Sequence, residues 1–227
     1  MDGVRELAPR DRARLWLART DGHATDGGDG GGGADGAGVL DADELRRAAG
    51  FRFARHRVRY VAAHLALRGI LGERLGCAPG AVRFVREPCP RCAEPHGRPA
   101  LADARDLHFS LSHSGDLALI ALAPVPVGMD VEELPSAEAA RELAAVLHPR
   151  ERAELAALAD PVEHRDALAR AWVRKEAYLK GIGTGLSRAP DLDYVGALPG
   201  VPGSPDGWTV RDVPVPSGHL AAVALAP

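Results

Sequence analysis

The hydrophobic positions predict short strands in the first half of the chain. Apolar runs of strand length lie at 14–20 ("RLWLART") and at 81–87 ("AVRFVRE"). A longer run at 107–124 is interrupted at Ser114-Gly115-Asp116, a turn sequence that predicts a β-hairpin. These strands indicate at least one antiparallel sheet.

Helical spacing of apolar residues alternates with the strands. Asp41 and Glu44 have the spacing of a capping box, which predicts that a short helix begins directly after Asp41. Longer helices are expected at 52–71, with Val58, Val61, Leu65 and Leu67 as inner positions, at 138–147, at 149–159, and at 165–183, where Gly181 and Gly183 end the last one.

One stretch of the sequence occurs twice. "SGDLALIALAP" at 114–124 returns as "SGHLAAVALAP" at 217–227, with eight of eleven positions identical. Strands rich in Ala and Leu resemble one another, but the matching Ser-Gly turns and terminal prolines favour a duplication. We expect an α+β fold of two similar subdomains, residues 1–125 and 126–227, each with a long helix on a small antiparallel sheet. A ligand is expected between them.

Residues 21–38 are glycine-rich and contain no apolar anchor beyond alanine. This composition predicts a flexible insert. The insert lacks the Gly-Lys-Ser/Thr ending of a phosphate-binding loop, so that interpretation is rejected.

Composition and charge exclude several classes of protein. A net charge of −3 argues against a nucleic-acid binder with a uniformly basic surface. Three cysteines do not make a disulfide framework, and the first residues lack the apolar region of a signal peptide. The longest apolar run is broken by prolines and is too short to span a bilayer. We therefore expect a cytoplasmic protein with no membrane or nucleic-acid partner.

Acidic side chains gather near the expected joint of the two halves. In "VGMDVEEL", Asp130 and Glu132 are two residues apart and share one face of an extended segment. Glu176 and Lys180 are one turn apart on the last long helix. Three carboxylates could provide hard oxygen ligands for Mg²⁺, which accepts phosphate oxygens at its remaining positions. Equally, the acids could be solvated, with Glu176 paired to Lys180.

Lys175 and Lys180 are the only lysines in a chain with 26 arginines. A lysine presents a compact point charge, whereas arginine presents a planar fork. Helix geometry places Lys180 on the face of Glu176 and points Lys175 elsewhere.

Two further segments carry polar groups that suit phosphate. His113 stands between Ser112 and Ser114 in "FSLSHS", where hydroxyls and turn amides accompany the ring. A histidine in this place is more often a structural hydrogen-bonding group. Arg98, in "HGRPAL", could fork onto a phosphate or stack on a base, and by itself marks only a turn.

Together, "GRP", "FSLSHS", "GMDVEEL" and "WVRKEAYLK" resemble the signature segments of the Sfp-type 4′-phosphopantetheinyl transferases, of the kind found with actinobacterial polyketide and nonribosomal peptide systems. The resemblance runs from about residue 14 to the C-terminus. It implies a monomer with pseudo-twofold α+β architecture that moves phosphopantetheine from coenzyme A to the serine of an apo acyl or peptidyl carrier protein. The implied by-product is 3′,5′-ADP.

The resemblance also implies roles for single residues. Asp130, Glu132 and Glu176 would be the ligands of Mg²⁺, for which Mn²⁺ could substitute. Lys180 and His113 would hold the pyrophosphate. Glu176, or a water that it orients, would take the proton of the carrier serine.

The nucleotide end of coenzyme A is assigned in the same way. Arg98 and Ser112 would line the adenosine, and Arg55 and Arg59 would meet the 3′-phosphate. The sequence departs from the family here, since the family often has Asn where Ser110 stands and Lys where Arg98 stands. The adenine contacts are therefore less closely defined than the metal ligands.

Two other classes remain open from the sequence. A Mg²⁺-dependent phosphohydrolase acting on a CoA-like pyrophosphate would use the same three carboxylates. A non-catalytic zinc-binding module is suggested by Cys89, Cys92 and His96 in "CPRCAEPH". A structural zinc takes four ligands, and the remaining cysteine, Cys77, lies beyond a Pro-Gly turn.

Overall fold

The computed structural model describes residues 3–21, 38–95, 97–200 and 202–227. Most of the glycine-rich insert lies outside these residues, so its expected flexibility stays a prediction. The helices are α1 (Ala42–Ala49), α2 (Ala54–Leu75), α3 (Ala137–Ala145), α4 (Pro149–Ala156) and α5 (Pro161–Ile182). The strands are β1 (Val4–Glu6), β2 (Arg14–Arg19), β3 (Phe84–Arg86), β4 (Pro99–Leu101), β5 (His108–Ser114), β6 (Leu117–Ala123), β7 (Val127–Glu133), β8 (Thr209–Asp212) and β9 (His219–Leu225).

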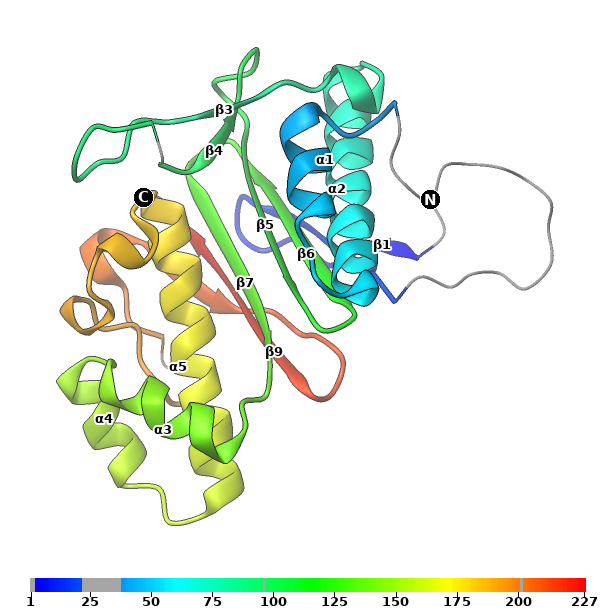
Figure 1. The fold of residues 1–227 in the computed structure, drawn as a ribbon. Helices are drawn as coiled ribbons and strands as arrows, with labels where there is room; N and C mark the ends of the chain where they lie inside the picture. The colour runs from blue at the N-terminus through cyan, green and yellow to red at the C-terminus, as the bar shows by residue number, and fades with distance from the viewer. Residues whose placement is uncertain (1–2, 22–37, 96, 201) are drawn as a thin grey trace.

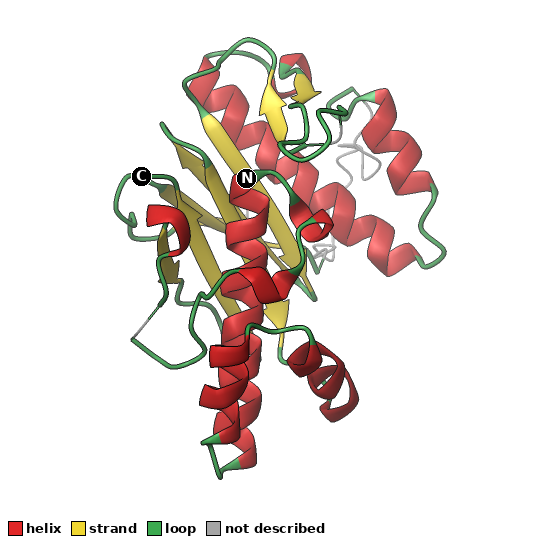
Figure 2. Cartoon of the chain, turned by 90° about the vertical axis from the view of Figure 1, so that its left-hand side faces the viewer, coloured by secondary structure: helices red, strands yellow, loops and turns green. Residues whose placement is uncertain are grey.

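The strands form two main antiparallel sheets and one small hairpin. The first sheet has the order β1-β2-β6-β5, the second has the order β7-β9-β8, and β3 pairs with β4. Figure 1 shows α1 and α2 beside the first sheet and α5 along β7 and β9. In the turned view of Figure 2, the strands lie between these helices. The expected α+β class is confirmed.

The two halves repeat one topology. The order β2, α2, β5, β6 along the chain returns as β7, α5, β8, β9. In both sheets the second strand of the late hairpin is central, giving β2-β6-β5 and β7-β9-β8. The repeated "SG" turns have Gly115 at φ +54° and Gly218 at φ +87°, a region that glycine enters without strain. This match supports duplication of one supersecondary unit.

A shared apolar core joins the halves. It draws on β2 and β6 from the first sheet and on β7 and β9 from the second. Each long helix then covers an outer face, with α2 packed in one cluster and α5 in another. The shared core contains Leu15, Leu17, Leu117, Leu119, Met129, Val131, Val223 and Leu225, all buried.

Strands β5 and β7 meet where the two sheets adjoin, and serine side chains connect them. Ser110, Ser112 and Ser114 alternate with other residues along β5, so their hydroxyls share one face. These hydroxyls accept hydrogen bonds from backbone amides of β7. The pairs are Met129 N to Ser110 Oγ at 2.9 Å, Val131 N to Ser112 Oγ at 3.3 Å, and Glu133 N to Ser114 Oγ at 3.1 Å. We call this row the serine seam.

Several helix details differ from the sequence prediction. Asp41 and Glu44 do form the capping box of α1. Val58 was expected to be buried but is 43% exposed, because this face of the N-terminal part of α2 points to solvent. Helix α5 begins at Pro161 rather than 165, since the Asp160 side chain caps its first amides. Gly181 does not end α5; the cap is Gly183.

Candidate active site

Two glycines allow β7 and α5 to approach closely. A Cβ added to Gly128 would lie 1.9 Å from the carbonyl oxygen of Ala177 and 2.4 Å from the amide nitrogen of Gly181. A Cβ added to Gly181 would lie 2.4 Å from the ring of Trp208. Larger residues would force strand and helix apart. The glycines therefore determine how near the polar groups of β7 and α5 come to each other.

The carboxylate of Asp130 lies at the centre of this junction. The residue is 1% exposed. Lys180 Nζ lies 2.5 Å from Asp130 Oδ1, and Ser112 Oγ donates to the same oxygen at 2.8 Å. Lys180 also donates to Ser112 Oγ at 3.1 Å. The structure thus brings together three of the predicted site residues, from β5, β7 and α5.

Glu132 and Glu176 flank this centre. Ser114 Oγ donates to Glu132 Oε2 at 2.7 Å. Burial raises the pKa of Glu132, and so does the negative charge of Asp130. Burial and Asp130 likewise raise the pKa of Glu176. Burial also raises the pKa of Asp130, against the opposing effects of Lys180 and Ser112. The three carboxylates therefore affect one another in a poorly solvated place.

The three carboxylates are the candidate ligands of a divalent cation. In the described residues, no group of three or more His, Cys, Asp or Glu side chains is arranged to hold a metal ion. Asp130 Oδ2, however, is buried without a hydrogen-bond partner, and a buried carboxylate oxygen without a partner is costly. Hard oxygens with raised pKa values match the ligand preference of Mg²⁺. The chemistry of the residues fits the ion, while its coordination stays a prediction.

A cavity of about 920 Å³ opens beside the junction. It lies between the N-terminal helices, the β3–β4 hairpin, β5 and the C-terminal end of α5. Among its lining residues are His113, Arg98 and Lys180. Three of the predicted phosphate-binding groups therefore line one cavity, and Lys180 also contacts Asp130.

The chain is similar to known proteins of one family. A family model described as the 4′-phosphopantetheinyl transferase superfamily matches residues 126–203, which include β7 and α5. The chain is 34% identical over 200 residues to 4′-phosphopantetheinyl transferase HetI of Nostoc sp. (strain PCC 7120 / SAG 25.82 / UTEX 2576), covering 85% of this chain and 81% of HetI. The chain belongs to the 4′-phosphopantetheinyl transferase superfamily. It is a transferase.

More distant relatives match shorter parts. 4′-Phosphopantetheinyl transferase Sfp of Bacillus subtilis (strain 168) is 34% identical over 94 residues, 40% of either chain. The L-aminoadipate-semialdehyde dehydrogenase-phosphopantetheinyl transferase of Mus musculus is 27% identical over 159 residues, 65% of this chain and 49% of that protein. The predicted resemblance to this superfamily is confirmed, and a non-catalytic module is no longer a competing interpretation of the whole chain.

Other predicted site residues of this transferase have structural partners. Arg98 Nη1 donates to the carbonyl oxygen of Gly181 at 2.8 Å, and its Nε lies 2.7 Å from Glu87 Oε2. Arg98 thereby ties the β4 end of the first half to the end of α5. Ser112 is buried against Asp130 and is not among the residues that line the cavity. Its predicted place beside adenosine stays a prediction.

Two predicted arginines on α2 do not line the cavity. Arg55 is exposed and stacks over Phe53, with its guanidinium carbon 4.8 Å from the ring centroid. Arg59 Nη2 lies 2.5 Å from Asp116 Oδ1, at the β5–β6 turn. Arg59 lies near enough to His113 for its charge to act on the ring, but neither arginine is among the residues that line the cavity. A contact of either residue with the 3′-phosphate remains a prediction.

His113 is exposed at the cavity wall and lies edge-on to Tyr60, with ring centroids 6.5 Å apart. Local burial of the ring lowers the pKa of His113, and the positive charges of His64, Lys180 and Arg59 act in the same direction. A bound phosphate would counter that repulsion.

The other lysine of α5 has a structural role. Lys175 is 1% exposed and pairs with Glu151 Oε2 at 2.9 Å; it also donates to the carbonyl oxygen of Asp193. Next to it, Arg174 is fully buried and makes a bidentate pair with Asp212. As predicted, Lys175 points away from Glu176.

Of the three residues suggested for zinc, two lie within the described residues. Cys89 is buried and Cys92 is exposed, while His96 lies outside the described residues. Hydrogen bonds from the amides of Arg91 and Cys92 lower the pKa of the Cys89 thiol. Metal binding by these three residues stays a prediction.

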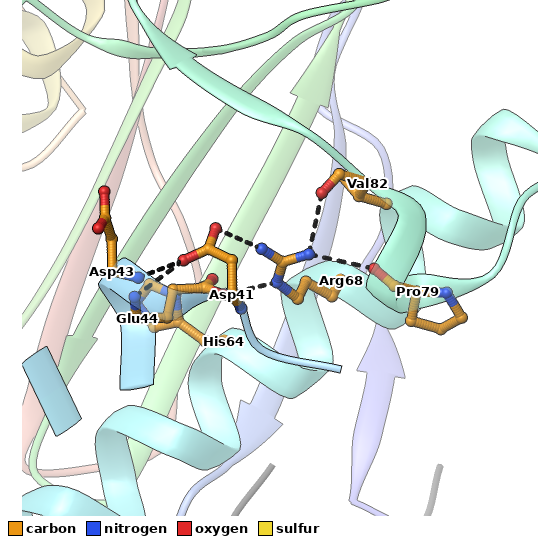
Figure 3. A network of polar contacts seen from close by, with 7 residues as sticks. All are labelled: Asp41, Asp43, Glu44, His64, Arg68, Pro79 and Val82. Carbon is orange, nitrogen blue, oxygen red and sulfur yellow. Dashed lines mark hydrogen bonds and ion pairs between the residues drawn. The ribbon is translucent and has the colours of Figure 1, made fainter. Parts of the chain in front are cut away.

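Sequence reasoning missed a buried polar network on the first half. Arg68 is fully buried and bonds Asp41 Oδ2 and Glu44 Oε2, each at 2.7 Å (Figure 3). It also donates to the carbonyl oxygens of Pro79 and Val82. The capping-box spacing was the only available signal, and it predicts a helix start rather than a network.

Proposed function

We propose that this transferase moves the 4′-phosphopantetheine group of coenzyme A to a serine of an apo acyl or peptidyl carrier protein, with Mg²⁺, and releases 3′,5′-ADP. The observation that carries the proposal is the meeting of Asp130, Lys180 and Ser112 beside a cavity that Lys180 and His113 line. Superfamily membership supports the same reaction.

Coenzyme A would lie in the cavity with its pyrophosphate toward Lys180 and His113. The serine oxygen attacks the phosphorus nearest pantetheine, the bond from that phosphorus to the bridging oxygen breaks, and 3′,5′-ADP leaves with the bridging oxygen. Lys180 neutralises charge that develops on the phosphate oxygens. Glu176 accepts the proton of the attacking serine, for which its raised pKa is favourable.

Asp130, Glu132 and Glu176 would hold the Mg²⁺. When bound, the ion supplies positive charge to the pyrophosphate oxygens. Asp130 Oδ2 is the oxygen without a hydrogen bond and is the first candidate to contact it.

The proposed partners are carrier domains of polyketide or nonribosomal peptide synthases, and the proposed state is a cytoplasmic monomer. In the described part of the chain, no helix is long and apolar enough to cross a membrane. Hydrolysis of a CoA-like pyrophosphate is the second candidate, since the carboxylate set would serve water as well as serine.

Intact-mass analysis of an apo carrier protein tests the proposal. The carrier is incubated with the transferase, coenzyme A and Mg²⁺. The expected result is a mass gain of one phosphopantetheine on the carrier. Breakdown of coenzyme A without any gain on several carriers would favour the hydrolase.

A further inference from the structure

We propose that His64, oriented by the buried carboxylate of Glu44, binds a phosphate group of the coenzyme A substrate in the cavity. The inference rests on the proposed function and adds a residue that the sequence analysis did not single out. The network in Figure 3 includes His64, which also lines the cavity.

One ring nitrogen of His64 is already used. Its Nδ1 lies 2.9 Å from Glu44 Oε1, and the side chain is 19% exposed. Among the described residues, Nε2 has no hydrogen-bond partner. A carboxylate on Nδ1 makes that nitrogen the proton donor and fixes the direction of the ring. The free edge of a fixed ring is therefore available to a ligand in the cavity.

The groups around His64 carry a net negative charge. Arg68 supplies one positive charge to two carboxylates, Asp41 and Glu44, so the three groups together carry one negative charge. Glu44 is 7% exposed, and its other oxygen faces His64. When both ring nitrogens carry a proton, Nε2 is a donor, and an anion in the cavity would accept its hydrogen bond.

His64 lies near the proposed pyrophosphate end of the site, because His64 and His113 contact the same tyrosine. Tyr60 stands between two imidazoles, with its ring centroid 4.1 Å from that of His64 and 6.5 Å from that of His113. All three residues line the cavity. His64 comes from α2 and His113 from β5, so two histidines from different elements flank one tyrosine.

The acids that line the cavity have arginine partners. Asp41 and Glu44 are held by Arg68, and Asp43 pairs with Arg46 at 2.8 Å. Arg86 also lines the cavity and donates to the carbonyl oxygen of Gly97 rather than to an acid. Each of these three acids therefore has an arginine partner, and Arg68 serves two of them.

Two isosteric variants separate binding from a purely structural role. His64→Asn keeps a donor near Nδ1, toward Glu44, and loses the cavity edge. His64→Gln places a donor near Nε2 and loses the contact with Glu44. Binding of coenzyme A is measured by calorimetry, with melting temperatures in parallel. We expect Kd to rise at least tenfold for His64→Asn, a change of about 1.4 kcal/mol, and to stay within about threefold for His64→Gln.

The opposite order of the two variants, or unchanged affinity in both, would overturn the inference. Repeating the titration with dephospho-coenzyme A tells which phosphate is bound. An unchanged Kd for His64→Asn there indicates the 3′-phosphate, and a persistent loss indicates the pyrophosphate.

A measurement on the wild-type protein covers the case in which the variants do not fold. The ¹⁵N resonances of His64 should move toward the imidazolium values when 3′,5′-ADP is added, and an unchanged Nε2 signal would contradict the inference. If the wild-type protein bound no coenzyme A at all, the proposed function itself would fail, which is a different result.

Discussion

The ammonium of Lys180 lies 2.5 Å from the buried carboxylate of Asp130 and is itself one-third exposed, so the pair reaches from the interior to the cavity. Lysine suits this place because a compact charge fits between Asp130 and Ser112, whereas a guanidinium fork requires more width. We expect Lys180→Arg to lower the transfer rate at least tenfold, about 1.4 kcal/mol of barrier, in steady-state kinetics.

Arg165→Lys on the same helix is the matched control, because among the described residues Arg165 pairs only with its neighbour Asp166, at a half-exposed position. It should leave the rate unchanged. A Lys180→Arg enzyme as fast as the wild type would mean that only the charge at this position matters.

Lys175 should behave in the opposite way. Lys175→Met leaves Glu151 buried without its cationic partner, and Glu151 is 0% exposed. We expect the free energy of unfolding to fall by about 3–5 kcal/mol in urea denaturation. The half-exposed Arg165→Met should change it by less than about 1 kcal/mol. Equal, small effects of the two substitutions would show that the Lys175 pair contributes little to stability.

Two serines of the serine seam allow a paired test. Ser110→Ala removes the acceptor of one β7 amide, while Ser112→Ala also removes a hydrogen bond to Asp130 and one from Lys180. We expect similar losses of stability, about 1–3 kcal/mol for each. Only Ser112→Ala should lower kcat, by about tenfold. If both variants lowered kcat equally, the seam would act by positioning β7 as a whole.

Glu44 gives a prediction for pH. Burial raises the pKa of Glu44, but hydrogen bonds from His64 and the Asp41 amide and the charge of Arg68 outweigh it, so the net pKa lies below the ordinary value of 4.5. A carboxylate with a lowered pKa stabilises the folded state above its unfolded pKa and loses that contribution as pH falls through the folded value.

Glu44→Gln should therefore lower the free energy of unfolding by about 1.5–3 kcal/mol at pH 7. The difference from the wild type should shrink as pH falls below 4.5, because the wild-type carboxyl then becomes protonated and resembles the amide. Urea denaturation at pH 7 and near pH 4 measures both. A difference that did not depend on pH would indicate a packing effect alone.

Periodicity and turn chemistry predicted most of the elements. A few adjacent residues are enough to predict the hairpin at 107–124 and the capping box of α1. The duplication follows from two matching stretches of eleven residues. Helix α5 began four residues earlier than predicted, because Pro161 follows a capping Asp and was not included in the pattern. Val58 was misplaced because the first turns of α2 have no apolar neighbour over that face.

Contacts between distant segments could not be predicted from the sequence. The pair of Lys180 with Asp130 follows from the close approach at Gly128 and Gly181, and glycine in a sequence does not tell which backbone comes near. Burial of Lys175 on Glu151 depends on where α4 packs. Side-chain patterns indicated the candidate residues, and packing determined which of them meet.

The repeated topology has a consequence for stoichiometry. Strand β2 of the first copy corresponds to β7 of the second. The face of β2 toward α2 carries Trp16 and Ala18, whereas the face of β7 toward α5 carries Asp130. In the first half, apolar side chains therefore occupy the face that holds the central carboxylate in the second half. Two architectural copies thus offer one set of the proposed acidic ligands, and equilibrium dialysis should find one tightly held divalent ion per chain rather than two.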